Sequence, residues 1–160
     1  MTVDATSIID YSYTDFLAGI QSIAHQVETS GWSPDYIVGI VRGGAVPAVY
    51  LSHALKIPVV MVLWNTRDNT HFGNESNAWI PEDLIDGKKV LLVDDIVDGG
   101  ETIKELLADW QTSVRDIIPE ENVRIASLIY NTAQDVPVDF FDKIIDRDED
   151  QRWIIFPWEI

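Results

Sequence analysis

Short apolar runs alternate along this chain with segments of helical period, and this alternation limits the fold more than any other feature. Five apolar runs predict buried strands: 36–41, 58–63, 89–93, 123–130 and 143–146. Three longer segments predict helices: 14–30 and 101–110, whose apolar residues fall on one helical face, and 45–55, which has Pro47 in its first turn. Strands separated by helices form a mainly parallel sheet, so the sequence predicts an α/β domain with a central parallel sheet flanked by helices. Ligands of such sheets bind beyond the carboxyl ends of the strands.

Length and composition favour one domain and exclude several kinds of site. The 160 residues fit a single domain, 1–160, and no repeat or linker divides them. The absence of cysteine excludes disulfides and thiolate metal sites, and the only histidines, His25, His53 and His71, make a histidine-built zinc site improbable. The sequence has no secretory signal and no run of about 18 apolar residues, so we expect a cytoplasmic protein with no membrane partner.

The charge balance limits which ligands can bind. The formal net charge is −16 at pH 7, so nucleic acid, whose phosphates would be repelled, is not an expected partner. Any phosphate site must therefore depend on local donors: backbone amides, helix N-termini, a few cations and a metal ion. For the acidic residues themselves we expect a solubilising surface rather than a functional acidic tail.

The segment 65–81 has few periodic apolar residues and is rich in asparagine. A segment of this length without a helical or strand period predicts a functional loop or a mobile lid. The only basic residues in it are Arg67 and His71.

The turn after the third predicted strand carries two adjacent carboxylates, Asp94 and Asp95. Neighbours on a strand point to opposite faces, so one acid can reach a ligand while the other braces the loop. Carboxylates at this position can accept hydrogen bonds from sugar hydroxyls or hold Mg²⁺, directly or through water. Charges at the end of a buried strand are costly unless they are used or hydrated, which favours a functional role.

The same turn continues through Asp98, Gly99 and Gly100 to Thr102 at the start of a predicted helix. Glycines let backbone N–H groups approach an anion, and the helix dipole adds partial positive charge. The turn is thus a candidate phosphate cradle that needs no lysine. The structural alternative is an ordinary turn in which Asp98 and Thr102 cap the helix.

The segment Asp94-Asp95-Ile96-Val97-Asp98-Gly99-Gly100-Glu101-Thr102, behind the apolar run, resembles the signature of the type I phosphoribosyltransferases. The resemblance implies that Asp94 and Asp95 serve the ribose hydroxyls and magnesium, and that Asp98 assists proton transfer at the base. It also implies that the rest of the turn holds the 5-phosphate: Gly99, Gly100, Glu101 and Thr102. The family usually has threonine or serine where this chain has Gly99, so one hydroxyl donor is lost.

Two further segments resemble the purine branch of that family. Arg42-Gly43-Gly44, after the first predicted strand, is similar to its pyrophosphate loop, although such a triplet alone fits an ordinary turn. Near the C-terminus, Trp153 stands where these enzymes stack a tryptophan on the purine, Ile154 where the backbone reads the base edge, and Glu159 where a terminal acid lies near the base or metal. The structural alternative is a terminal strand packed on the core, which suits Phe156 and Trp158.

The chain departs from the purine branch at Asn131, where the family has a lysine that donates to the purine 6-oxo group. An amide can donate or accept, so selection of an oxo group over an amine is weakened; alternatively, Asn131 only ends a strand and caps the next turn. The mobile loop of the family also supplies a basic residue to pyrophosphate, a position that His71 or Arg67 could take.

Together these patterns predict a type I phosphoribosyltransferase fold with a small hood at about 131–160. The implied reaction transfers the 5-phosphoribosyl group of phosphoribosyl pyrophosphate to a guanine, xanthine or hypoxanthine type of purine, with Mg²⁺ as cofactor and a homodimer or homotetramer as the assembly. Arg42 and Mg²⁺ would stabilise the departing pyrophosphate. The alternatives are transfer to another base, or a non-catalytic regulator that binds phosphoribosyl pyrophosphate.

Overall fold

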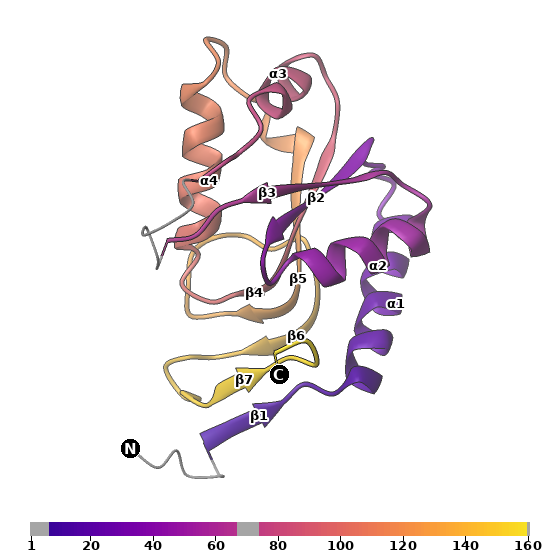
Figure 1. Cartoon of the computed structure of the whole chain (residues 1–160), viewed down its shortest axis with the longest axis vertical. Coiled ribbons are helices and arrows are strands. Elements are labelled where there is room, and N and C mark those ends of the chain that lie inside the picture. Colours follow the sequence, from indigo (N-terminus) through magenta and orange to yellow (C-terminus); the bar gives the residue numbers. More distant parts are fainter. Residues whose placement is uncertain (1–6, 67–73, 160) are drawn as a thin grey trace.

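The chain folds around a five-stranded parallel sheet with the strand order β3-β2-β4-β5-β6. The computed structural model describes residues 7–66 and 74–159. The strands are β1 (Ile8–Asp10), β2 (Tyr36–Val41), β3 (Val59–Leu63), β4 (Val90–Val97), β5 (Val123–Asn131), β6 (Phe140–Ile145) and β7 (Trp153–Ile155). The helices are α1 (Tyr13–Thr29), α2 (Ala45–Leu55), α3 (Trp79–Ile85) and α4 (Glu101–Thr112), with a short 3₁₀ turn at Glu120–Asn122. Figure 1 shows the sheet with the helices around it and the β1–β7 pair at one end.

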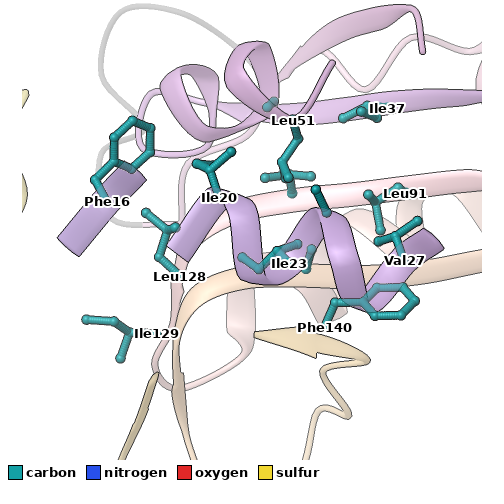
Figure 2. Close-up of a cluster of buried hydrophobic side chains, with 14 of the residues drawn as sticks. Phe16, Ile20, Ile23, Val27, Ile37, Leu51, Leu91, Leu128, Ile129 and Phe140 are labelled. Carbon is teal, nitrogen blue, oxygen red and sulfur yellow. The ribbon is translucent and has the colours of Figure 1, made fainter. Parts of the chain in front are cut away.

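Two hydrophobic layers cover the sheet because successive strand residues point to opposite faces. In β4, Leu91 and Val93 belong to one buried cluster and Val90 and Leu92 to the other. The first cluster packs against α1 and α2, and Figure 2 shows the α1 side chains lying over the strands. The second packs against α3 and α4. The α/β prediction with a central parallel sheet is therefore confirmed.

Local signals in the sequence explain where the two helices of the first layer begin. Ser12 accepts a hydrogen bond from the Asp15 backbone N–H at 3.0 Å, and the Asp15 carboxylate accepts one from the Ser12 N–H, which together form a capping box for α1. In α2, Pro47 lies in the first turn, where its missing N–H leaves no helical hydrogen bond unmade.

The structure differs from the prediction at several element boundaries. β4 continues to Val97, so the two adjacent acids lie within the strand instead of after it. The predicted loop 65–81 ends in ordered structure: Leu63 and Glu75 form an antiparallel bridge, and α3 begins at Trp79. The final predicted strand begins earlier, at Phe140.

The two ends of the described chain form a small sheet of their own. β1 pairs with β7 in parallel, with Ile8 opposite Trp153 and Ile9 opposite Ile154. The region predicted as a C-terminal hood therefore also contains a strand from the N-terminal end, which the sequence analysis did not foresee. Within the described residues, none of the helices is both long enough and apolar enough to cross a membrane.

Candidate active site

The predicted site residues gather at the carboxyl edge of the three adjacent strands β2, β4 and β5. Arg42 follows β2, the two acids Asp94 and Asp95 lie near the end of β4, and Asn131 is the last residue of β5. Because carboxyl ends of parallel strands meet at one edge of a sheet, the fold brings together segments that are far apart in the sequence.

The two acids of β4 lie in a poorly solvated environment. Asp95 is 9% exposed, and Asp94 keeps some accessible surface although protein surrounds it. Burial raises the pKa of Asp94 well above its usual value, and the charge of Asp95 raises it further. Burial likewise raises the pKa of Asp95, and the charge of Glu159 acts in the same direction. Two unpaired acids that resist ionisation are a suitable place for a divalent cation to compensate their charge.

The few hydrogen bonds to these carboxylates come from the strand itself. The Asp95 backbone N–H donates to Asp94 Oδ1 at 2.9 Å, and the Ile96 N–H donates to Asp95 Oδ1 at 2.7 Å. No lysine or arginine within the described residues forms an ion pair with either acid. Their remaining lone pairs are available for a cation or for sugar hydroxyls.

The acid pair is suited to a magnesium ion whose other ligands are substrate phosphates and water, and not to a metal ion enclosed by protein side chains alone. Among residues 7–66 and 74–159, no group of three or more histidine or acidic side chains could enclose a metal ion. Magnesium is usually held by one or two carboxylates together with substrate phosphates, and it keeps several waters. Asp94 and Asp95 supply oxygen ligands of this kind.

The turn after β2 lies directly over Asp95. A Cβ atom on Gly43 would overlap the Asp95 carboxylate, and one on Gly44 would overlap the Val93 carbonyl, so both positions require glycine. The peptide bond between Val41 and Arg42 is cis. The Arg42 side chain is exposed, and its guanidinium forms no hydrogen bond or ion pair with any described residue.

The second glycine turn begins α4 without help from a side chain. Gly100 is the N-cap residue in a left-handed conformation with φ 84°, and no side chain caps the helix. The alternative in which Asp98 and Thr102 cap this helix is therefore wrong. The Thr102 hydroxyl has no partner among the described residues. The Glu101 carboxylate folds back over Gly99, where a Cβ atom would overlap it, and so places a negative charge beside the helix N-terminus.

Asp98 forms an ion pair that the sequence analysis missed. Arg147 Nε donates to Asp98 Oδ1 at 3.0 Å, and Arg147 Nη2 donates to Oδ2 at 3.3 Å. Arg147 follows β6 and lies in an acidic run, Asp146 to Asp150. The one signal in the sequence is a basic residue within that run.

The Asn131 side chain forms three hydrogen bonds with backbone groups of the protein. Its Nδ2 donates to the Asp98 carbonyl at 2.9 Å, while its Oδ1 accepts from the backbone N–H groups of Ala133 at 3.0 Å and Arg147 at 3.1 Å. Asn131 is also buried, with 5% of its surface exposed. This geometry favours the alternative in which Asn131 ends the strand and caps the next turn.

The C-terminal segment divides into exposed and packed aromatic residues. Trp153 is 58% exposed on β7, and its ring meets no other aromatic ring of the described chain. Ile154 is buried, and Phe156 and Trp158 stack at 5.1 Å against the core, as the alternative of a packed terminal strand expects. Glu159 Oε2 accepts from the Phe156 N–H at 3.0 Å.

The two basic residues of the predicted loop, Arg67 and His71, lie outside the described residues. The segment before them is fastened to α4: Trp64 Nε1 donates to Glu105 at 3.3 Å. The segment after them is fastened there as well, because Trp110 Nε1 donates to the Ser76 carbonyl at 2.9 Å.

Comparison with known proteins identifies relatives over nearly the whole chain. Residues 11–160 match the family described as the phosphoribosyl transferase domain. A xanthine-guanine phosphoribosyltransferase of Idiomarina loihiensis is 30% identical over 128 residues, which cover 78% of this chain and 70% of the relative. The protein of that name from Cereibacter sphaeroides is 29% identical over 130 residues, which cover 78% and 68%. The structure of a xanthine-guanine-hypoxanthine phosphoribosyltransferase of Helicobacter pylori aligns over 96% of this chain and 94% of its own, with a TM-score of 0.69 and 27% identity.

Proposed function

Because the chain belongs to the phosphoribosyl transferase domain family, in its purine branch, we propose that it transfers the 5-phosphoribosyl group of phosphoribosyl pyrophosphate to a purine of the guanine, xanthine or hypoxanthine type. The products are a purine nucleotide and pyrophosphate, as in nucleotide salvage. The chain is thus an enzyme of the glycosyltransferase class. The observation that carries the proposal is the buried pair of acids between two glycine turns at the carboxyl edge of the sheet.

In this proposal the acid pair and the two glycine turns bind the sugar and the phosphates of phosphoribosyl pyrophosphate. Asp94 and Asp95 would bind the ribose hydroxyls and would hold Mg²⁺, which would supply positive charge to the pyrophosphate. The turn of Gly99, Gly100, Glu101 and Thr102 binds the 5-phosphate through backbone N–H groups and the Thr102 hydroxyl. The turn of Arg42, Gly43 and Gly44 binds pyrophosphate, and the unpaired Arg42 guanidinium is available for this.

The base has a separate set of partners. Trp153 offers an exposed ring on which a purine can stack, and the Ile154 backbone and Glu159 lie on the same segment. In the reaction, a ring nitrogen of the purine forms a bond to the anomeric carbon of the ribose while the bond from that carbon to the pyrophosphate oxygen breaks. The electron pair of the broken bond leaves with pyrophosphate. The Asp98 carboxylate accepts the proton that the purine loses.

Three parts of the chain build the site in this proposal: the domain itself, a loop and a C-terminal hood. We propose one phosphoribosyltransferase domain over 1–160, a loop at about 65–81 that closes over the pyrophosphate, and a hood at about 131–160 that β1 completes. Either Arg67 or His71 would bring a positive charge to the pyrophosphate from that loop. Closure would exclude water, which otherwise competes with the purine.

A second candidate function keeps the enzyme and changes the base. The observation that favours it is the engagement of Asn131: this buried, neutral side chain donates to the Asp98 carbonyl and accepts from two backbone N–H groups, so it offers a purine 6-oxo group no charged donor. Transfer rates with guanine, xanthine, hypoxanthine, adenine and uracil, each with phosphoribosyl pyrophosphate and Mg²⁺, would test both candidates. The first expects the three 6-oxopurines to be the best substrates. Faster transfer to adenine or uracil would support the second, and no transfer to any base would refute both.

The assembly and the location belong to the same proposal. α2 has no acidic residue in a chain that has 27, and its exposed Val49 and Tyr50 lie next to the exposed Tyr13 of α1. An apolar face of this kind is commonly covered by another subunit, so we expect a homodimer or homotetramer. The cytoplasmic location is expected on separate grounds, from the sequence features given above. Light scattering should show a smaller particle for Val49→Asp than for the unmodified chain. A monomer in both would contradict this assembly. No nucleic-acid or membrane partner is expected.

A further inference from the structure

Arg147 forms the least exposed ion pair of the described chain. Its side chain is 17% exposed, and the side chain of its partner Asp98 is 32% exposed. The guanidinium uses two nitrogens for the two oxygens of Asp98, the fork-to-fork geometry that fixes both distance and plane. Sequence patterns and family resemblance assign no role to Arg147.

The rest of the guanidinium is bound to the segment that leads to the base platform. Nη1 donates to the Asp150 carbonyl at 3.3 Å and to the Arg152 carbonyl at 2.6 Å. Four of the five guanidinium N–H groups therefore have acceptors. Since Arg152 directly precedes Trp153, the guanidinium connects Asp98 with the start of β7.

The backbone of Arg147 is also fixed in place. Its N–H donates to Asn131 Oδ1 at 3.1 Å, and the Asn131 amide group in turn donates to the Asp98 carbonyl at 2.9 Å. These bonds close a ring that runs from the Asp98 carboxylate to Arg147, then to Asn131, and back to the Asp98 carbonyl. A connected network of this kind holds its members more firmly than isolated bonds would.

A second ion pair, between Arg152 and Asp150, provides a comparison for the pair of Arg147 and Asp98. Arg152 binds Asp150 through the same fork, at 3.0 and 2.8 Å. Its side chain, however, is 51% exposed and touches no predicted site residue. The two pairs share their chemistry and their arginines lie close together in the sequence, but of the two only Arg147 reaches a carboxylate at the edge of the sheet.

We propose that Arg147 is a positioning residue for phosphoribosyl transfer: it fixes the Asp98 carboxylate and sets its distance from Trp153. The inference rests on the proposed function, in which Asp98 accepts a proton from the base and Trp153 holds the base. A proton acceptor must lie within hydrogen-bond reach of the proton it takes, so a carboxylate free to rotate loses rate. Arg147 acts through Asp98 and the segment before Trp153, and it need not touch the substrate.

The test compares Arg147→Gln and Arg147→Lys with Arg152→Gln, using the best base of the panel. Arg147→Gln should lower kcat about 100-fold, the loss typical of a misplaced reacting group, while KM for phosphoribosyl pyrophosphate stays within about twofold. Arg147→Lys keeps the charge without the fork and should recover part of the loss. Arg152→Gln removes an equivalent exposed pair and should retain the unmodified rate.

A double-mutant cycle then decides whether Arg147 works through Asp98. If it does, Asp98→Asn with Arg147→Gln should be no slower than Asp98→Asn alone. Losses that multiply, or a folded Arg147→Gln protein with unchanged kcat, would overturn the inference. If Arg147→Gln does not fold, Arg147→Lys decides in the same way, and a lysine variant with unchanged kcat counts against the inference. An unmodified chain inactive with every base would refute the proposed function itself, and the inference with it.

Discussion

Asp94→Asn should stabilise the metal-free protein while removing its affinity for phosphoribosyl pyrophosphate. The pKa of Asp94 is raised by burial and by the neighbouring charge of Asp95. Above that raised pKa, the folded chain must keep a negative charge in an environment that disfavours it, whereas the unfolded chain keeps it in water. Asparagine has nearly the same shape and no charge, so the substitution removes this cost.

The sign follows from proton linkage. A carboxylate with a raised pKa binds more protons in the folded state than in the unfolded state, so its contribution to stability falls as the pH rises from the unfolded pKa, about 3.9, through the folded one. Each unit by which the pKa is raised corresponds to about 1.4 kcal/mol. Removing such an unfavourable group from a functional site commonly gains roughly 0.5–2 kcal/mol. For a chain of this length, that gain corresponds to an increase in Tm of about 1–8 °C.

The assay is calorimetric unfolding in EDTA at pH 7.5 and at pH 4.5, with Asp116→Asn as the matched control. Asp116 is exposed, and its substitution removes the same charge from a chain whose net charge is −16. The stabilisation by Asp94→Asn should exceed that of the control at pH 7.5 and shrink at pH 4.5. Titration calorimetry with phosphoribosyl pyrophosphate and Mg²⁺ should show strong binding only for the unmodified chain and the control. Equal effects of both substitutions on Tm, or a lower Tm for Asp94→Asn, would refute the reasoning.

Three further predictions concern the base and the phosphate. Trp153→Ala should raise KM for the base about tenfold with little change in KM for phosphoribosyl pyrophosphate, because stacking on an aromatic ring is worth about 1–3 kcal/mol per base. Steady-state kinetics that show equal changes in the two KM values would indicate a packing role for Trp153 instead. Asn131→Lys should leave the ratio of kcat/KM for guanine and adenine unchanged and reduce stability by about 1–3 kcal/mol, because the amide forms hydrogen bonds with backbone groups. Competition kinetics in which the variant prefers guanine more than the unmodified chain does would place this residue at the base. Glu101→Gln should tighten binding of phosphoribosyl pyrophosphate about two- to fivefold, since it removes a negative charge beside the helix N-terminus that is proposed to bind the 5-phosphate. Calorimetry that shows weaker binding would mean that the Glu101 carboxylate contributes to binding.

The centre of the sheet was predictable because it is buried on both faces. β2 and the first half of β4 are apolar at nearly every position, which distinguishes them from helices and from half-exposed strands. The apolar run stops at Val93, but the pairing with β5 continues through Asp94 opposite Ser127 to Val97 opposite Tyr130. The prediction therefore ended the strand too early, because two acids interrupt the hydrophobic pattern while the backbone ladder continues.

Elements that depend on distant partners were not predictable in the same way. β1 has three residues and pairs with β7 at the other end of the chain, so no local pattern marks it. α3 contains Pro81 and follows a polar segment, yet Ile80 and Leu84 are buried against the second layer. In both elements, tertiary packing outweighs a weak local signal.

The candidate site shows the same division between local and distant information. The acids Asp94 and Asp95 at the end of β4 and the left-handed Gly100 belong to one continuous segment of the chain, so spacing alone indicates where a phosphate or metal would lie. Arg147 is 49 residues from Asp98 in the sequence, and the acidic neighbours around it suggest a solvated surface. Only the three-dimensional pairing shows that this arginine belongs to the carboxyl edge of the sheet.

The difference between the two arginines near the site explains how an acidic chain could bind an anion. The Arg147 guanidinium has four of its five N–H groups bound to protein acceptors, so its charge is already balanced by Asp98. The Arg42 guanidinium is exposed and has no partner in the described chain, so its charge remains available to a ligand. If Arg42 instead paired with Asp95, under the neighbouring Gly43, the proposed metal and pyrophosphate sites would neutralise each other. Engaging one arginine with Asp98 and leaving the other free lets the acid pair attract a cation while the β2 turn attracts an anion, which is the charge pattern that a magnesium pyrophosphate group requires.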